Sequence, residues 1–196
     1  MNSVFLCGYV DKEPVFSHEC MGENFYEFYM SANRDSGVKD FIRCIVPEVY
    51  LQNIVIGNNY IFGEIRTRNV REENNRLDTT VFVNGFYEPD SEDCNIVELE
   101  GFICKEPVYR ETPLGRQICD LALAVNRKNS RSSDYIYCLA WGRTAIMASK
   151  FKIGTEVSLR GRLQSREYNK QIADGIMEVR TVHEVSINQI SKKVVE

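Results

Sequence analysis

The chain has 196 residues, of which 43% are hydrophobic and 27% charged, and its formal net charge is −4. No apolar stretch approaches the length of a membrane span, and the N-terminus lacks a basic region and a cleavage site, which argues against a membrane protein or a secreted one. Seven cysteines are scattered without a C-x-x-C pair, so we expect mostly buried free thiols rather than disulfides or a metal site.

Charge is distributed unevenly along the chain. Residues 1–92 hold 8 Lys and Arg against 15 Asp and Glu, whereas residues 93–196 hold 16 against 13. An anionic partner is therefore expected to prefer the second half.

The sequence contains an internal repeat. Residues 2–34 align with residues 95–127 at a constant offset of 93, with eleven identities in 33 positions. The offset changes only slightly further on, where "DFIRCIV" at 40–46 meets "DYIYCLA" at 134–140. Offsets that change only in loops indicate one fold used twice.

Turn residues separate short alternating runs, which predict five strands in each copy. In chain order, the first copy has strands near 3–10, 24–33, 40–46, 59–68 and 78–87, and the second near 96–103, 117–126, 134–141, 156–167 and 176–187. One short helix is expected between strands three and four, at 47–55 and 143–151. Five strands with a helix after the third is the plan of the OB-fold, a Greek-key barrel, so we predict an all-β chain of two tandem OB-folds.

These elements predict the domain organisation. OB-fold 1 is expected over residues 1–88, an acidic linker over 89–94, OB-fold 2 over 95–190 and a short tail over 191–196. Because the linker is short, the two barrels are expected side by side.

Strand alternation nominates a binding surface on the second copy. In 134–141 the small apolar residues are expected inside, and Tyr135, Tyr137, Leu139 and Trp141 outside. In the next strand the outward residues are expected to be Arg160, Arg162, Gln164, Arg166 and Tyr168, and the loop before Tyr135 adds Arg127, Lys128 and Arg131. Exposed rings beside cations suit single-stranded nucleic acid, because rings stack on unpaired bases and cations neutralise phosphates.

Other interpretations of the same residues remain open. Tyr135 and Tyr137 could cover a barrel edge or a subunit interface, and Trp141 could pack beneath the helix that follows it. The arginines could form a solvated face. No nucleophile elbow, paired-carboxylate arrangement, phosphate-binding loop or metal-ligand spacing is present, so neither an enzyme nor a metal or cofactor site is expected.

The second copy contains the turn "KEPVYRETPLG", the strand end "AVNR", the strand end "AWGR" and the run "GTEVSLRGRLQSREY", in this order. With these motifs, nearly all of 95–190 resembles a known family, the bacterial single-stranded DNA-binding proteins. The resemblance implies DNA stacking at Tyr135, Trp141 and Tyr168 and backbone contacts at Arg127, Arg162 and Arg166. It also implies a bacterial or phage protein of the cytoplasm or nucleoid.

The first copy matches the family only in outline. Pro47 stands where the second copy has Trp141, and Val70 stands where it has Tyr168. A weaker site remains open there, made of residues on its expected outward face: Tyr29, Phe41, Arg43, Arg66 and Arg68.

The expected function is binding and protection of single-stranded DNA during replication, recombination or repair, without strong sequence preference. Family members commonly assemble four OB domains, so the resemblance implies a homodimer of this tandem chain. The alternative is an interaction module like the primosome accessory proteins, in which replication or repair proteins dock on the acidic first copy and nucleic-acid binding is secondary. RNA is a third option, because stacking alone does not distinguish the sugars.

Overall fold

The computed structural model describes residues 1–34, 36–70, 76–88, 95–128, 130–173 and 175–193. The linker expected at 89–94 and the last three residues of the expected tail lie outside this part. The first half contains β1 (Asn2–Val10), β2 (Val15–Cys20), β3 (Glu23–Asn33), β4 (Lys39–Pro47), the 3-10 helix η1 (Glu48–Asn53), β5 (Gly57–Val70) and β6 (Arg76–Phe86). The second half contains β7 (Asn95–Ile103), β8 (Val108–Glu111), β9 (Gln117–Asn126), β10 (Ser133–Trp141), the helix α1 (Gly142–Ala148), β11 (Glu156–Ala173) and β12 (Ile176–Lys192).

Each half closes into a five-stranded barrel. In the first, β3, β4, β6, β5 and β1 pair in that order, β4 and β6 run parallel, and a β1–β3 pairing completes the circle. The second half repeats this arrangement with β9, β10, β12, β11 and β7. The all-β OB-fold prediction is confirmed. The prediction missed β2 and β8, short strands that pair only with β3 and β9.

Identical glycines allow each barrel to close. A Cβ added at Gly8 would lie 2.8 Å from the carbonyl oxygen of Ser31, and one added at Gly101 would lie 2.6 Å from that of Ala124. Both contacts are closer than side chains tolerate, because the neighbouring atom belongs to the rigid backbone. Both copies of the repeat therefore keep glycine where the first strand crosses its neighbour, β1 over β3 and β7 over β9.

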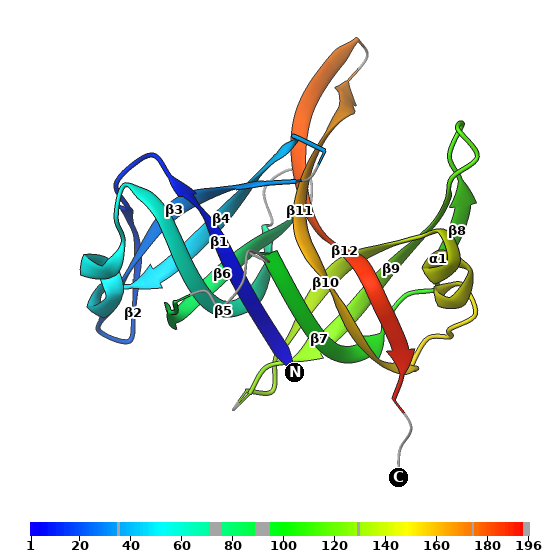
Figure 1. Cartoon of the computed structure of the whole chain (residues 1–196), viewed down its shortest axis with the longest axis horizontal. Coiled ribbons are helices and arrows are strands. Elements are labelled where there is room, and N and C mark those ends of the chain that lie inside the picture. The colour runs from blue at the N-terminus through cyan, green and yellow to red at the C-terminus, as the bar shows by residue number, and fades with distance from the viewer. Residues whose placement is uncertain (35, 71–75, 89–94, 129, 174, 194–196) are drawn as a thin grey trace.

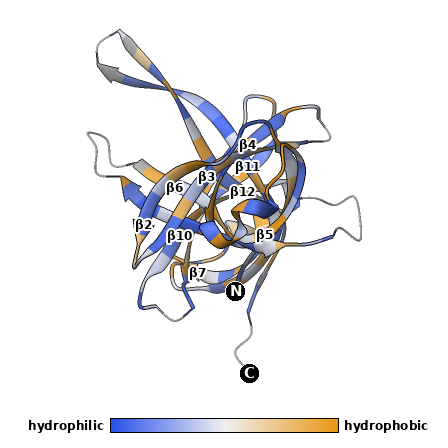
Figure 2. Cartoon of the chain, turned by 90° about the vertical axis from the view of Figure 1, so that its left-hand side faces the viewer, coloured by the Kyte–Doolittle hydropathy of each residue, from blue (hydrophilic) through white to orange (hydrophobic). Residues whose placement is uncertain are grey.

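Alternating burial builds the core of each barrel, and Figure 2 shows apolar and polar segments interleaved along the strands. Two residues predicted on the outer face are buried there. Leu139 and Gln164 lie in the same hollow as Trp141, where neighbouring elements cover them, and Gln164 donates a hydrogen bond to Glu184. Among the cysteines, Cys44, Cys119 and Cys138 are buried free thiols, as expected.

Three described cysteines differ from the expectation of buried free thiols, and the first, Cys104, is free but only partly buried. Cys20 is a free thiol on the exposed β2, and Cys7 is disulfide-bonded. The burial of Cys44 and Cys138, which occupy matching positions in the two copies, raises the pKa of both thiols far above the ordinary range.

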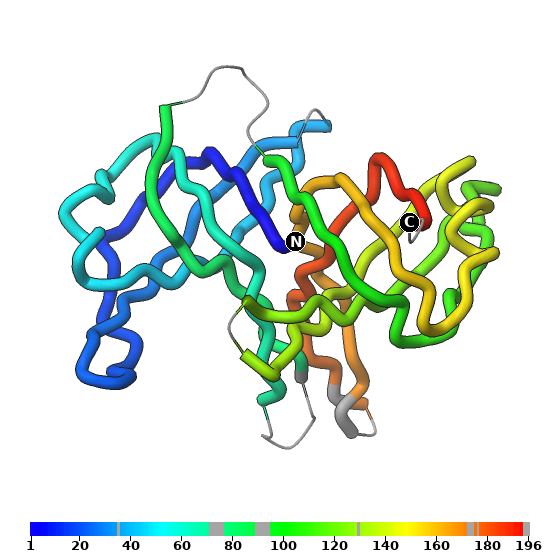
Figure 3. Tube along the Cα trace, turned by 90° about the horizontal axis from the view of Figure 1, so that it is seen from below, coloured from blue at the N-terminus to red at the C-terminus, as the bar shows by residue number. Residues whose placement is uncertain are grey.

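The two barrels share one continuous sheet. Strand β1 pairs antiparallel with β7, from Asn2 opposite Leu99 to Leu6 opposite Asn95. Figures 1 and 3 show the halves side by side with these two strands at the junction. The barrels are therefore joined by backbone hydrogen bonds as well as by the chain between them.

The hairpin of β11 and β12 is longer than the predicted strands. Pairing continues from Val157 opposite Lys192 to Ala173 opposite Ile176. We call the part of this hairpin from the pair Arg166–Val182 outward the arm, and its far end stands away from the barrel in Figure 1. Within the described part of the chain, no helix is long and apolar enough to cross a membrane.

Candidate nucleic-acid interface

The four rings predicted to stack on bases are all at the surface. Tyr135 is 51% exposed, Tyr137 39%, Trp141 40% and Tyr168 39%. Strand β10 carries the first three at alternate positions, because Ile136, Cys138 and Ala140 fill the core from its other face. Large rings with free faces beside strands are the geometry that base stacking requires.

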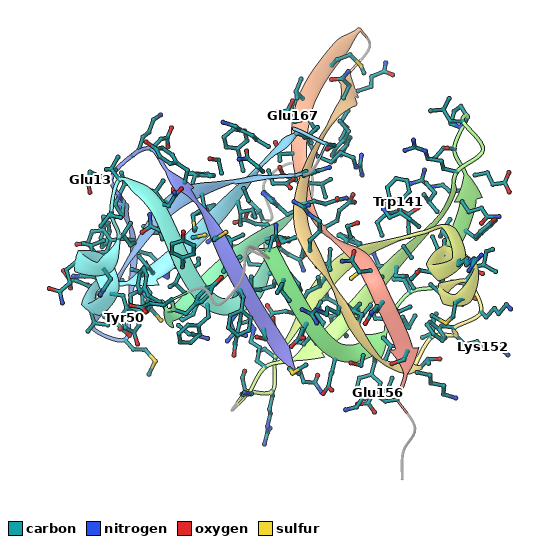
Figure 4. All side chains as sticks on the ribbon, viewed as in Figure 1. Glu13, Tyr50, Trp141, Lys152, Glu156 and Glu167 are labelled. Carbon is teal, nitrogen blue, oxygen red and sulfur yellow. The ribbon has the colours of Figure 1, made fainter. Side chains whose placement is uncertain are left out.

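Trp141 lies on a groove of about 840 Å³. Its rim includes Arg110 of β8 and Arg166 and Glu167 at the base of the arm. Figure 4 shows Trp141 between the arm, where Glu167 is labelled, and β8. We call this hollow the Trp141 groove. It also receives Lys39 and Phe41 from the first barrel.

The three tyrosines lie on a second hollow of about 390 Å³, which we call the tyrosine groove. Tyr135, Tyr137 and Tyr168 line it together with Lys105 and Lys170. Lys105 Nζ lies 5.2 Å from the centre of the Tyr137 ring and 3.2 Å from its hydroxyl oxygen. Thr181 lines both grooves, so the arm separates them.

Cations accompany the rings, but their environments differ. Lys128 and Arg131 are exposed on the β9–β10 loop, and within the described residues neither has a carboxylate within 4 Å. Arg166 lies 5.8 Å from the centre of the Tyr168 ring and its Nε is 3.5 Å from a Glu184 oxygen. These three side chains keep a face toward solvent, where a phosphate can reach them.

Arg127, which the resemblance places on the DNA backbone, is held by a buried carboxylate. Its Nε and Nη2 donate to Asp134 at 2.9 and 2.7 Å. The same carboxylate accepts from the amide of Thr67 at 2.7 Å and from Arg66 at 3.1 Å, both in the first barrel. We call these four residues the Asp134 clamp. It joins β10 to β5 across the two barrels.

Arg162 lies in the matching arrangement on the other side, the Asp40 clamp. Arg34 donates to Asp40 through Nε at 2.9 Å and Nη2 at 2.5 Å. Asp40 also accepts from the amide of Ser165 at 2.7 Å and from Arg162 Nη2 at 3.2 Å. The two clamps are reciprocal, because each barrel supplies the carboxylate of one and the backbone amide of the other.

Both clamp carboxylates are fully buried. Burial by itself would raise the pKa of Asp40, but the bonds from Arg34 and from the Ser165 amide outweigh it and hold the pKa below its usual range. The pKa of Asp134 is lowered in the same way by Arg127 and the Thr67 amide. Both side chains are therefore charged and fully paired at neutral pH.

The clamps were not predicted from the sequence, although one signal was present. Each copy places an aspartate shortly after a shared arginine, Asp40 after Arg34 and Asp134 after Arg127. Such a pair within one hairpin can form a bidentate ion pair. The sequence does not show that the partner barrel supplies the remaining donors.

The structure places the residues of the weaker site expected on the first copy in separate locations. Arg43, Arg66 and Arg68 line a pocket of about 350 Å³, which Arg127 of the second barrel also lines. Arg43 pairs with Glu27 and Asp78, Arg68 also pairs with Asp78, and Arg66 pairs with Glu64. Phe41 lies instead on the Trp141 groove, and Tyr29 stands exposed on β3 opposite Arg43. Arg43 and Arg68 are thus neutralised by carboxylates of their own barrel, whereas Arg66 is shared between Glu64 and Asp134 of the second barrel.

No group of three or more His, Cys, Asp and Glu side chains that could hold a metal ion occurs in the described ranges. His18 stacks on Phe25 with 5.0 Å between ring centres, and His183 Nε2 donates to the carbonyl oxygen of Phe41 at 2.8 Å. Both histidines thus have structural contacts.

Comparison with known proteins identifies the family of the second barrel. The model of the "Single-strand binding protein family" matches residues 94–192, which is the whole second barrel. The chain belongs to the single-strand binding protein family. This assignment covers the barrel that carries both grooves and the arm.

Relatives with similar sequences match less than half of the chain. The chain is 39% identical over 83 residues to "Single-stranded DNA-binding protein A" of Bacillus subtilis, covering 39% of this chain and 48% of that protein. It is 38% identical over 80 residues to "Single-stranded DNA-binding protein 2" of Listeria innocua, covering 38% and 50%. The chain thus spans about half the length of these relatives.

Solved structures resemble both barrels together. The wild-type single-stranded DNA binding protein from Thermus aquaticus matches with a TM-score of 0.77 and 21% identity, covering 100% of this chain and 94% of that one. A deletion mutant of the same protein matches with a TM-score of 0.76 and 20% identity. The tandem OB architecture is therefore a known form of this fold.

Proposed function

We propose that this protein binds single-stranded DNA without strong sequence preference and protects it during replication, recombination or repair in the bacterial cytoplasm. One observation carries the proposal: two grooves with exposed rings and cations flank the arm of the barrel that matches the family. The names of the bacterial relatives support it. In this proposal the chain is a binding protein and not an enzyme.

Bases stack on Trp141 in one groove and on Tyr135, Tyr137 and Tyr168 in the other. Stacking on an aromatic side chain contributes about 1 to 3 kcal/mol per base and is tolerant of sequence, because every base has a flat face. A strand that passes from one groove to the other must cross the base of the arm, where Arg166 lies.

Phosphates are contacted by the cations whose side chains remain exposed, which includes Arg166, since it is 52% exposed beside Glu184. Lys128, Arg131 and Arg166 fill this role, with Lys105 and Lys170 at the tyrosine groove. Arg127 and Arg162 act differently, since their guanidinium groups are engaged by Asp134 and Asp40. We propose that these two hold the barrels in register and so position the grooves.

Titration of the full chain with oligo-dT tests the proposal. Trp141 is the only tryptophan, so quenching of its fluorescence reports on the groove itself. We expect quenching at micromolar DNA in low salt and release of the DNA as salt rises. Each phosphate contact makes the slope of log K against log[salt] more negative by about 0.7. No response of Trp141, together with no binding by filter retention, would overturn the proposal.

We propose that two chains assemble and present four OB barrels. An aromatic cluster on the outer face of β1 and β5 supports this: Phe5 contacts Phe62 and Tyr87, and Tyr60 contacts Tyr87. Phe5 is 37% exposed, which is more than a buried core ring. Sedimentation equilibrium should give twice the chain mass, and a monomer at micromolar concentration would contradict the assembly.

A second function is favoured by the outer face of the first barrel, where Arg43 and Arg68 are paired with Glu27 and Asp78 of the same barrel. This surface suits a docked replication or repair protein better than a phosphate backbone, as in the primosome accessory proteins. Competition separates the alternatives: oligo-rU equal to oligo-dT in affinity would favour an RNA or mixed role. Weak binding of both would favour docking as the main function.

A further inference from the structure

Two residues of the first barrel, Lys39 and Phe41 on β4, lie on the Trp141 groove of the second barrel. Phe41 is 56% exposed, and among the described rings it has no aromatic partner within contact. The groove therefore has an aromatic ring from each barrel, with Arg166 also on its rim.

The backbone around Phe41 is fixed to the second barrel at both of its polar groups. Its amide donates to Ser165 Oγ at 3.1 Å on β11, and its carbonyl accepts from His183 Nε2 at 2.8 Å on β12. The preceding residue, Asp40, is the buried centre of its clamp. The ring thus projects from a rigid point on the neighbouring barrel, although its own side chain is half exposed. Such preorganisation lowers the entropy cost of binding.

We infer that Phe41 is a stacking residue for the DNA bound by the second barrel, and that Lys39 supplies a phosphate contact beside it. The Trp141 groove is then a composite site that is incomplete without the first copy. This inference rests on the proposed function and names a new part of the same site.

The tyrosine groove is composite in the same sense. Asn69 of β5 and Leu77 of β6, both in the first barrel, line it beside Tyr135. The amide of Tyr135 donates to Thr67 Oγ1 at 2.8 Å, which matches the bond between Phe41 and Ser165. The reciprocal clamps therefore bring one aromatic residue of each copy against the other barrel.

Tyr29 provides the matched control. It belongs to the same barrel and is 50% exposed, close to the exposure of Phe41. It stands on β3 opposite Arg43, whose guanidinium is paired with Glu27 and Asp78, and it lines neither groove. If exposure alone decided stacking, the two rings would behave alike.

A single tryptophan moved to each position tests the inference directly. In the full chain, Trp141→Phe removes the native probe, and Phe41→Trp or Tyr29→Trp then installs one reporter. We expect oligo-dT to quench the tryptophan at position 41 and to leave the one at position 29 unchanged. If binding is present by filter retention but position 41 does not respond, the inference is overturned.

Affinity supplies the second measurement. Phe41→Ala keeps both backbone bonds, so we expect its unfolding midpoint to match wild type within error while its affinity for oligo-dT falls about 5- to 150-fold, the equivalent of one stacked base. Tyr29→Ala should change affinity less than twofold. Equal affinity of Phe41→Ala and wild type would refute the composite groove, whereas a wild-type chain that binds no oligo-dT would refute the proposed function itself.

Discussion

Replacing Asp40 by Asn should destabilise the folded protein far more than loss of a surface ion pair. The carboxylate accepts five bonds, from Arg34, Arg162 and the amide and hydroxyl of Ser165. Asparagine keeps one acceptor oxygen and can retain the bond from the amide. Its NH₂ group would then face the Nε of Arg34 and the Nη2 of Arg162, so two charge-assisted hydrogen bonds are lost.

Each bond to a charged group contributes about 1.5 to 3 kcal/mol. The arginine side chains are 23% and 24% exposed, so part of the loss is recovered by water. We therefore expect Asp40→Asn to lower the free energy of unfolding by about 2 to 4 kcal/mol. For a chain of this size that corresponds to a fall in Tm of roughly 4 to 16 °C.

Asp120→Asn is the control, because Asp120 makes the same bidentate contact with Arg110 on the surface. The distances are 2.8 and 3.2 Å, but the two side chains are 52% and 41% exposed. Exposed pairs contribute at most about 1 kcal/mol. Denaturant unfolding of both variants compares the two. An equal loss for Asp40→Asn and Asp120→Asn would show that the clamp is not a buried ion pair.

The clamp also predicts a pH dependence. The pKa of Asp40 is lowered in the folded state, so its contribution is fully present above the pKa of an unfolded aspartate, about 4. It is lost as pH falls through the lower, folded pKa. Wild type should therefore lose stability below about pH 4, and Asp40→Asn should lose less over the same interval. Parallel curves for the two proteins would contradict this assignment.

Three further outcomes are expected. Lys128→Gln and Arg131→Gln should each lower the salt slope of oligo-dT binding by about 0.7 without changing the unfolding midpoint, and an unchanged slope would remove them from the interface. Trp141→Ala should weaken oligo-dT binding about 5- to 150-fold in a filter assay at constant salt, and a change of less than twofold would argue against stacking there. Gly161→Ala should cost about 1 to 3 kcal/mol in chemical unfolding, because its Cβ would lie 2.2 Å from the backbone oxygen of Ser186; wild-type stability would mean that the bulge shifts freely.

The fold was largely predictable because its signals are local. Alternation in β10 placed Ile136 and Cys138 in the core and Tyr135 and Tyr137 outside, and the repeat applied the same pattern to the first copy. Alternation failed at Leu139, because a strand residue that faces outward can still be covered by a neighbouring element. The short strands β2 and β8 were missed because their residues are mostly exposed and show no apolar period.

The roles of the arginines were the least predictable part of the site. A guanidinium group binds a phosphate and a carboxylate in the same bidentate way. Sequence alone therefore could not separate Arg131, which is exposed on a loop, from Arg127, which is held by Asp134. The partner of each arginine depends on which strand lies beside it after folding.

By itself, the sequence determined that one OB plan is used twice, that the second copy carries the rings and the positive charge, and that those rings face outward. These properties follow from strand period, turn residues and composition, which act over a few neighbouring residues. Only the tertiary structure decided that the copies are joined through β1 and β7 and by reciprocal buried clamps, and that Phe41 of the first barrel lies on the Trp141 groove of the second. Those contacts join residues far apart in the chain, from 67 positions for Thr67 and Asp134 to 125 for Asp40 and Ser165. No local pattern records which distant strand will be their neighbour.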